Sequence, residues 1–568
     1  MGKARRAPQA RRSAAVTLQA SPPAPAWLRW VILGLAALLL VAWLSREAGD
    51  SDSWWHLKTG QFILTQHRLP VPDPFAYTTY LGKPLYSGEE VTRYFNLTHE
   101  WLAQIAMYGA YAAAGLTGLI LARAAMLSLF CALAGLMAYR RTRSFPRALV
   151  AVFAAAMIVH AFTADRPQYF TYVFLALTLN LLDARRRLWL LPPLFLIWAN
   201  CHGGFFLGWV AVAIYCAEAG YFRWRGKPVD GERRLWLAGL SAILASGFNP
   251  NGFRVFEVLW NYGRSPLQAQ ILEWYHPVFW ELSPFTVLLY GGVVALIWNR
   301  RKTRPADWLL LAAFGSAGLL AFRNVVLAGF VGAFLIAAYV PMPKSKIALR
   351  ERPAAGFAVA ALLLAGTLVL IAQGKAFRFR ASPRTPVGAA DFLLDHHIQG
   401  KLFNTYGQGG YLIWRLWPRW QVFVDGRVLN ESVAYDAQRI MYAADDSGGK
   451  SFDDLLRDYR IDVIVMDCFE PVSGAAYYLP TALADPRQTE WKLVYRDGHD
   501  VIYMRRPPPD LAPLNPLDGL VGMEQQCAFL TADGAPACAK GMVDVFTRIG
   551  DLERAHKWAV IQNGAHVE

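Results

Sequence analysis

Residues 49–60 read GDSDSWWHLKTG and follow directly on a long apolar run, residues 26–44. A run of that length spans a bilayer as a helix, so two acids, two tryptophans and a histidine are expected where a membrane helix meets water. A cleaved signal peptide is the competing interpretation. Further apolar runs follow, however, and no convincing small-x-small cleavage pattern precedes Asp50, which favours an uncleaved anchor. We expect the chemistry of the protein to begin here.

The composition is typical of a polytopic membrane protein. Of the 568 residues, 55% are hydrophobic, 14% aromatic and only 17% charged. A net charge of +15 would suggest a nucleic-acid partner in a soluble chain. Here the Lys and Arg residues cluster between apolar runs, where the positive-inside rule places them, so no nucleic-acid partner is expected.

About ten further apolar runs follow residues 26–44, which predicts about 11 transmembrane helices. They cover residues 116–139, 147–163, 168–182, 188–201, 203–221, 234–248, 284–299, 306–321, 325–340 and 354–373. Every second connection is basic and is expected to share the cytoplasmic side with residues 1–25, a disordered basic tail. This parity requires residues 101–114 to form an interfacial helix along the outer leaflet rather than a span. An odd number of spans then exports the C-terminal part of the chain.

The expected fold class is therefore mainly α, a polytopic membrane protein with an exported C-terminal α/β domain and a helical tail. The transmembrane domain covers 26–375, and its first external loop, 46–115, carries the interfacial helices. Residues 385–506 alternate helical patterns with β-rich runs, which predicts the α/β domain. The β-rich runs are 401–404, 421–424, 462–466, 491–494 and 501–504.

The tail, 507–568, carries two predicted helices, 523–530 and 540–562. Cys527 and Cys538 bracket a turn at 532–536 that contains Gly and Pro, and a disulfide between them requires an oxidising compartment.

The polar residues that remain fall on the outer face. Asp52 is the first choice for a general base, because partial burial between apolar helices raises the pKa of a carboxyl towards working pH. Asp50 fits either a functional acid or a solvated acid at a helix end. Trp54 and Trp55 can flank a sugar or anchor the interface.

Three cationic or potentially cationic residues, Arg166, Arg323 and His202, lie at ends of spans on the same side. A lipid-linked phosphate has its head group at that depth, and an arginine fork can neutralise the departing phosphate. Anchoring by snorkelling towards lipid head groups is the alternative for each.

Acids and histidines of the outer face could also hold a divalent cation, although only Asp52 and His56 have helical i, i+4 spacing. The identity of any metal stays open. The residues concerned are Asp50, Asp52, His56, His99, Glu100, Asp165, Glu273 and His276.

Several motifs together resemble bacterial integral-membrane proteins of the GT-C glycosyltransferases, distantly similar to protein mannosyltransferases and aminoarabinose transferases. The resemblance covers about residues 27–505. It rests on DSDSWWHLKTG at 50–60, LPVPDPFAYT at 69–78, HEWL at 99–102, DRPQ at 165–168, WANCHGG at 198–204, NPNG at 249–252, NTYGQGGYL at 404–412 and VDGR at 424–427.

The resemblance implies a sugar donor linked to polyprenyl phosphate, usually used with inversion, and a glycan, lipid or protein acceptor at the outer face of the bacterial cytoplasmic membrane. It matches Asp52 with the first-loop acid of these enzymes and Asp165 with their second acidic position. Relatives carry His/Lys-Pro-Pro-Leu at 99–102, so Trp101 is a departure. Substrate-binding residues are expected among Trp54, Trp55, His56, His99, Glu100, Glu273 and His276.

Two other function classes stay open. A transporter or flippase of lipid-linked glycans usually shows charges at the bilayer midplane and inverted repeats, and this sequence shows neither. A non-catalytic scaffold that retains the transferase fold would leave the outer-face acids and arginines dispersed.

Overall fold

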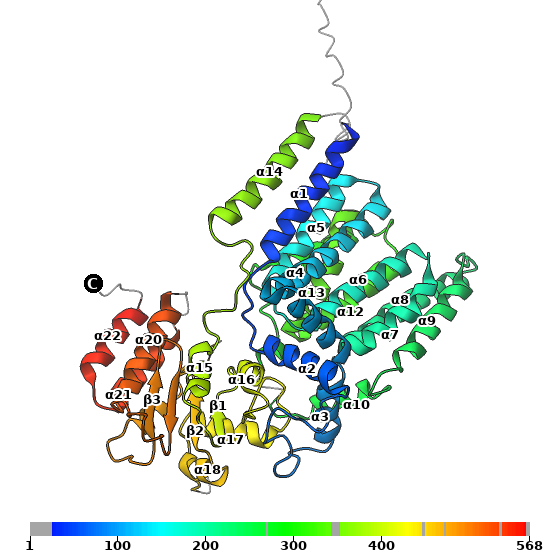
Figure 1. Ribbon diagram of the computed structural model, residues 1–568. Helices are drawn as coiled ribbons and strands as arrows, with labels where there is room; N and C mark the ends of the chain where they lie inside the picture. Colours follow the sequence, from blue (N-terminus) through cyan, green and yellow to red (C-terminus); the bar gives the residue numbers. More distant parts are fainter. Residues whose placement is uncertain are drawn as a thin grey trace, which may run out of the picture.

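The computed structural model describes residues 25–267, 271–341, 353–445, 449–470, 473–532 and 537–563. Figure 1 shows a helical bundle on one side and a smaller body with a β-sheet on the other. The predicted tail before Pro25, the basic connection at 344–352 and most of the turn at 532–536 lie outside the described residues.

A helix lies at each range predicted to span the membrane. The bundle helices are α1 (Ala26–Leu44), α4 (Trp101–Thr142), α5 (Phe145–Val159), α6 (Gln168–Ala184), α7 (Leu191–Cys201), α8 (Phe206–Trp224), α9 (Glu232–Ser246), α11 (Pro284–Trp298), α12 (Pro305–Leu320), α13 (Val325–Tyr339) and α14 (Pro353–Ala372). Within the described residues, six helical stretches are long and apolar enough to cross a membrane, and three further apolar helices are shorter. The prediction of a mainly α, polytopic membrane protein is confirmed.

The first external loop contributes two helices, α2 (Asp52–Gln66) and α3 (Glu89–Thr98). α2 packs closely on the first part of α4. Gly60 allows this approach, since a Cβ atom at that position would lie 2.2 Å from the Gln104 carbonyl oxygen. α4 is bent at Ala114 and Gly115, where the glycine has φ 58°, a left-handed conformation that favours glycine. The bend separates residues 101–114 from the rest of α4, as the sequence predicted, and their position in the outer leaflet stays a prediction.

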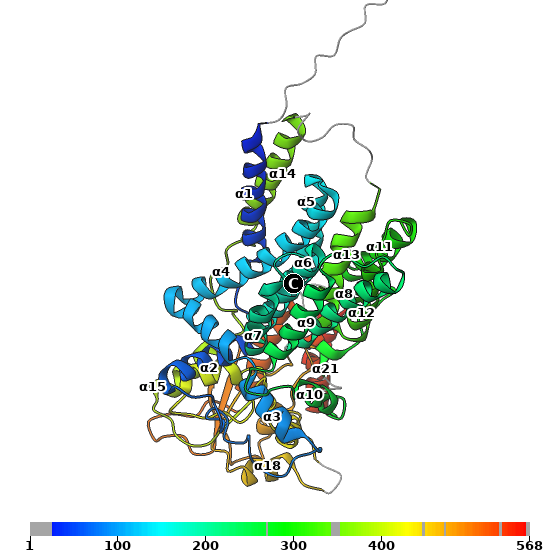
Figure 2. The same ribbon diagram turned by 90° about the vertical axis from the view of Figure 1, so that its right-hand side faces the viewer.

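α1 and α14 form a pair that stands beside the bundle in both views (Figures 1 and 2). Their contact consists of small and aliphatic side chains: Leu28, Ile32, Ala36, Ala360 and Leu363. Beyond them, the Ala48 amide donates to the Arg380 carbonyl at 3.0 Å and the Ser382 amide donates to the Ala48 carbonyl at 2.8 Å. This short pairing fixes the chain two residues before Asp50.

The C-terminal body contains a four-stranded sheet of order β1-β2-β4-β3. Its strands are β1 (Leu402–Asn404), β2 (Val463–Met466), β3 (Lys492–Arg496) and β4 (Val501–Met504), with β1 and β2 parallel and the other pairs antiparallel. Helices α15 (Val387–Asp395), α16 (Gly409–Leu416), α17 (Glu431–Met441), α18 (Phe452–Asp458) and α19 (Leu479–Leu483) complete it. Helices and strands therefore alternate here, as expected for an α/β domain.

Two details of the predicted C-terminal region were wrong. Residues 421–424 are not a strand of the sheet, because the backbone of Val422 pairs with the first external loop, accepting from the Tyr77 amide and donating to the Phe75 carbonyl. The predicted helix 540–562 is two helices, α21 (Ala537–Arg548) and α22 (Leu552–Gln562), which are separated at Gly550 with φ 81°.

The tail helices pack onto the sheet through one shared core. Met523 and Cys527 of α20 (Asp518–Ala532) and Trp558 of α22 are buried with Leu493 and Tyr503 of the sheet. A disulfide joins Cys527 to Cys538, with the two Cα atoms 5.5 Å apart. The remaining short helices connect these parts: α10 (Val255–Tyr262), η1 (His160–Phe162), η2 (Leu188–Leu190), η3 (Gly203–Phe205), η5 (Leu272–Trp274) and η6 (Phe322–Asn324).

Candidate active site

Arg166, just before α6, forms ion pairs with three carboxylates from separate parts of the chain. Its Nε lies 2.6 Å from Asp50 Oδ2, its Nη2 lies 3.1 Å from Asp52 Oδ2, and its Nη1 lies 2.8 Å from Glu273 Oε1. Four residues that the sequence placed on one face therefore form one ion-pair cluster. Arg166 therefore holds the three acids close together.

Asp52 is the first residue of α2 and is only 7% exposed. Its backbone amide donates to Asp50 Oδ1 at 2.8 Å, and the Trp55 indole donates to Asp52 Oδ1 at 2.9 Å. Burial raises the pKa of Asp52 to about 6, against the attraction of Arg166 and with a further rise from the charge of Asp50. A carboxyl with that pKa is ionised at neutral pH and still basic enough to take a proton.

Gly426, in the C-terminal body, packs directly against Asp52. A Cβ atom at position 426 would lie 1.7 Å from Asp52 Oδ1. The absence of a side chain therefore lets the C-terminal body form one wall of the site.

We expect Gly426→Ala to displace the Asp52 carboxylate and to lower kcat by roughly 100-fold, because a misplacement of about 1 Å at a reacting group has effects of that size. The measurement is the transfer rate, with Gly109→Ala as the control, since a Cβ atom there would meet nothing within 4 Å. Equal rates in the two variants would contradict this packing role.

Glu100 lies at the centre of three histidines. Its carboxylate oxygens are 3.2 Å from His99 Nε2 and 3.7 Å from both His56 Nδ1 and His202 Nε2. Burial would raise the pKa of Glu100, but the three rings, His99 above all, hold it below its usual range. The carboxylate therefore stays ionised and orients the rings around it.

The hydrogen bonds of His202 define which nitrogen carries its proton. Its Nδ1 accepts from the Gly204 amide at 3.0 Å and lies 2.8 Å from the Thr171 hydroxyl, which itself accepts from the Trp198 indole. Burial lowers the pKa of His202 to about 3, so the ring is neutral at pH 7 and its Nε2–H points towards Glu100. His202 is thus a neutral hydrogen-bond donor rather than a cation.

Two neighbouring cavities meet at Arg166, Gln168 and Arg323. The first, of about 150 Å³, is polar and is lined by Asp52, Trp55, His56, Asn96, His99, Glu100, His202, Gly426 and Arg427 in addition. The second, of about 220 Å³, has largely aromatic and small walls: Ala161, Phe162, Ala164, Tyr169, Tyr172 and Phe322, with Glu273. A polar and an apolar chamber therefore share one pair of arginines.

The two arginines differ in their partners. Arg166 is held by three acids, whereas Arg323 lies over the Trp274 ring at 4.8 Å and has no carboxylate within ion-pair distance in the described part of the chain. Arg323 is half-buried and faces both cavities. Its positive charge is thus available to an incoming anion.

Among solved structures, the chain resembles three membrane glycosyltransferases. It matches the Archaeoglobus fulgidus oligosaccharyltransferase with a TM-score of 0.53 at 12% identity, over 86% of this chain and 76% of that one. The chain has the GT-C fold. The AftD arabinofuranosyltransferase from Mycobacteria (TM-score 0.46, 15% identity) matches over 86% of this chain but 40% of its own length. ArnT from Cupriavidus metallidurans (0.46, 14%) matches over 84% and 97%. No protein-family profile and no curated sequence matches this chain.

Four predicted site residues lie outside the linings of the two cavities: Asp50, which is held by Arg166, and Asp165, Trp54 and His276. Asp165 is fully buried and its Oδ2 lies 2.6 Å from Nη1 of Arg123, which also donates to the Arg46 carbonyl. Trp54 packs edge-on against Tyr411 and lines a separate cavity on the other side of residues 49–54. His276 is near Leu319, whose carbonyl is 3.1 Å from the ring Nδ1. Asp165 is therefore placed to support the site rather than to touch substrate.

Sequence reasoning missed Arg427. Its Nη1 lies 2.8 Å from Asp73 Oδ1 and its Nη2 2.7 Å from Asp425 Oδ2, and the guanidinium lies 5.8 Å from the centre of the Trp55 ring. The motif VDGR at 424–427 was the available signal, but Asp73 is 354 residues away in the sequence. This triad joins the first external loop to the C-terminal body beneath Asp52.

The acids near Asp52 do not form a cation site in this structure. In the described residues, no group of three or more His, Cys, Asp or Glu side chains is placed to hold a metal ion. Asp50, Asp52 and Glu273 are instead each within ion-pair distance of Arg166. We therefore derive no step through a metal.

Proposed function

We propose that this protein is a membrane glycosyltransferase that moves a sugar from a polyprenyl-phosphate-linked donor to an acceptor at the outer face of the bacterial cytoplasmic membrane. The observation that carries this proposal is that Asp52, a buried carboxylate of raised pKa, shares a cavity with Arg323, an arginine without an acidic partner in the described residues. The GT-C fold supports it. The acceptor class, a glycan, a lipid or a protein, is left open.

The two chambers suggest where the lipid and the sugar of the donor would each bind. The aromatic chamber suits the first isoprene units of a lipid carrier, and Arg166 and Arg323 stand where that chamber meets the polar one. A phosphate at this junction would contact Arg323, whose guanidinium can form paired hydrogen bonds with phosphate oxygens. The sugar would then lie in the polar chamber beside Asp52.

In the proposed reaction, Asp52 takes the proton of the acceptor hydroxyl as its oxygen attacks the anomeric carbon. The bond between that carbon and the phosphate oxygen breaks, and the polyprenyl phosphate leaves with the bonding electrons. Arg323 stabilises the charge that develops on the phosphate. Attack from the side opposite the leaving group inverts the anomeric centre.

The proposed orientation places the site outside the cytoplasm. By the alternation of spans along the sequence, the basic connections fall on the side opposite Asp50, as the positive-inside rule requires of cytoplasmic loops. The disulfide between Cys527 and Cys538 suits an oxidising compartment, which supports export of the C-terminal body.

A binding experiment tests the donor class. Purified protein in neutral detergent is titrated with undecaprenyl phosphate, and Arg323→Gln is compared with Arg264→Gln, an exposed arginine that also lies over a tryptophan ring, at 5.4 Å. We expect Arg323→Gln to weaken binding by roughly tenfold or more, the size of a lost hydrogen bond to a charged group. The control should bind as the unchanged protein does.

Equal affinities in both variants would contradict the role of Arg323. Tight binding together with translocation of lipid-linked sugar across proteoliposomes, without any transferred product, would favour the flippase instead.

The pH dependence of transfer follows from the pKa of Asp52. Only the ionised carboxylate can accept the proton, so kcat/KM is expected to rise with pH and to reach half its maximum near pH 6. Because the negative charge of Asp50 raises the pKa of Asp52, Asp50→Asn should move this midpoint to lower pH. A midpoint that stays in place in Asp50→Asn would show that another group controls the profile.

A further inference from the structure

An arginine pocket lies at the opposite end of the bundle from the active site. It has a volume of about 670 Å³ and is lined by Arg140, Arg141, Arg143, Asn180, Leu181, Asp183, Ala184, Arg186, Arg187, Leu190 and Arg304. α6 runs from Gln168, in the active-site cavities, to Asp183, in this pocket. At 1.5 Å per residue this separation is about 22 Å, which approaches the thickness of the hydrocarbon core of a bilayer.

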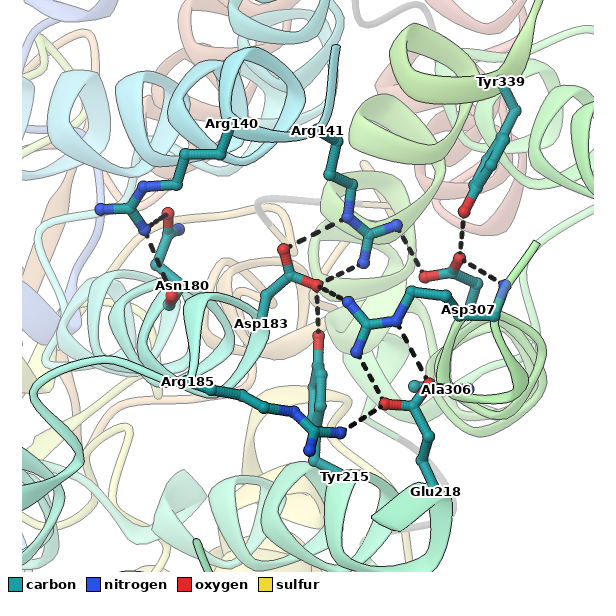
Figure 3. A network of polar contacts seen from close by, with 11 residues as sticks. Arg140, Arg141, Asn180, Asp183, Arg185, Tyr215, Glu218, Ala306, Asp307 and Tyr339 are labelled. Atoms are coloured by element: carbon teal, nitrogen blue, oxygen red, sulfur yellow. Dashed lines mark hydrogen bonds and ion pairs between the residues drawn. The ribbon is translucent and has the colours of Figure 1, made fainter. Parts of the chain in front are cut away.

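Arg141, Asp183 and Arg304 of the lining belong to a network, here called the floor, in which three arginines match three carboxylates (Figure 3). Arg141 bridges Asp183 at 2.5 Å and Asp307 at 2.7 Å. Arg304 bridges Asp183 at 2.8 Å and Glu218 at 2.6 Å. Because each charge of this floor is paired, it is rigid and nearly neutral.

The third pair of the floor joins Arg185 to Glu218 at 3.0 Å, and two tyrosine hydroxyls complete the network (Figure 3). The Tyr215 hydroxyl donates to Asp183 at 3.3 Å and the Tyr339 hydroxyl donates to Asp307 at 2.5 Å. No carboxylate of this floor is therefore free to neutralise further arginines.

Four further arginines at the rim of the pocket exceed the number of carboxylates in the floor. Arg140 donates only to the backbone and side-chain oxygens of Asn180, each at 3.2 Å. Arg143, Arg186 and Arg187 are exposed, and in the described ranges none of them has a carboxylate within ion-pair distance. Four positive charges thus line one pocket without an acidic partner among the described residues.

Two arginines at the rim have backbone conformations that are unfavourable for arginine, which indicates that their side chains have a role there. Arg143 has φ 54° and Arg187 has φ 56°, left-handed conformations that glycine or asparagine adopts more readily. Beside them, Trp189 is 70% exposed and Tyr139 is 38% exposed. Exposed aromatic rings next to cations are typical of the boundary between water and hydrocarbon.

We propose that this arginine pocket binds the phosphate head group of an anionic phospholipid in the leaflet opposite the active site. Arginine forks match phosphate oxygens, and the excess rim charges supply the attraction that the neutral floor does not. The apolar side chains of Leu181 and Leu190 in the lining and the exposed Trp189 beside it give the acyl-bearing side of the lipid a place to pack. These contacts favour a lipid over a soluble phosphate.

The test measures binding of phosphatidylglycerol to the full-length protein in neutral detergent micelles, with phosphatidylcholine as the uncharged reference. The pocket variant is Arg186→Gln with Arg187→Gln. The matched control is Arg300→Gln with Arg301→Gln, two exposed arginines of the connection between α11 and α12 that do not line the pocket. The thermal midpoint in phosphatidylcholine alone verifies that both double variants fold.

We expect the pocket variant to bind phosphatidylglycerol roughly thirtyfold more weakly than the unchanged protein, the combined effect of two basic residues at an anionic surface. The control should keep its affinity, and inorganic phosphate at the same concentration should not compete. Equal losses in the two double variants would show a general surface-charge effect and overturn the proposal. Competition by inorganic phosphate would identify a soluble-anion site and overturn it as well. If the pocket variant does not fold, Arg143→Gln alone is measured against Arg300→Gln, with the same outcomes.

Discussion

Asp52→Asn is expected to lower kcat for sugar transfer by roughly 100-fold to 10,000-fold, the range in which positioned general bases contribute. The amide keeps the size of the side chain and its oxygen can still accept from the Trp55 indole, but its NH2 group cannot replace the oxygen that faces Arg166, so the variant removes the base and one ion pair of Arg166. KM for the donor should change little, because Arg323 and the aromatic chamber are untouched. The measurement is single-turnover transfer with purified protein.

Glu90→Gln provides the control for Asp52→Asn. Glu90 also lies in the first turn of a helix of the external loop, α3, but it is exposed and lines neither active-site cavity. Its transfer rate should equal that of the unchanged protein. A fully active Asp52→Asn protein would falsify the assignment of Asp52 as the base and would leave the scaffold hypothesis in its place.

Arg123→Met is expected to lower the free energy of unfolding by about 3–5 kcal/mol, because it leaves a buried charge uncompensated. Arg123 and Asp165 are both fully buried, with Nη1 and Oδ2 2.6 Å apart, and Arg123 also binds the carbonyl of Arg46. The pair thereby ties α4 to the segment before Arg166 and to the chain before Asp50. The measurement is the unfolding midpoint in detergent.

The double variant Arg123→Met with Asp165→Leu distinguishes a charge effect from simple loss of packing. Removing both charges should restore most of the stability, since buried ion pairs are often replaced by apolar side chains at little cost. Arg415→Met, which breaks an exposed pair with Asp391 at 2.8 Å, should cost at most about 1 kcal/mol. If the double variant is no more stable than Arg123→Met, the ion pair is not the cause of the loss.

The helices of the membrane part were predictable because their signal is local. Each apolar run can be recognised from its own length and hydrophobicity. A helix lies at every predicted range, including α1 and α14. Breaks that depend on a single glycine were predicted less well. The bend at Gly115 was expected, whereas the break at Gly550 was not, because the residues on either side of it continue a helical pattern.

The candidate site was predictable as a set of residues but not as an arrangement. Asp50, Asp52, Arg166 and Glu273 were placed on one face by counting spans, and they are in contact. That Arg166 would be bound by all three acids, leaving Arg323 without an acidic partner in the described residues, depends on how separate helix ends meet. Distances between side chains of separate helix ends cannot be predicted from the local composition of the sequence.

The sequence by itself determined that this chain is a helical membrane protein with acids and arginines at one helix boundary, because hydrophobic length and charge sign act locally. Only the tertiary structure decided that Asp165 is paired with Arg123, that Gly426 touches Asp52, and that Arg427 reaches Asp73 across 354 residues. These contacts join segments far apart in the chain, and their geometry is set by the packing of whole helices and of the C-terminal body. The physical reason is that the burial that raises the pKa of Asp52, and the close contacts around it, arise only when separate segments pack together in the folded molecule.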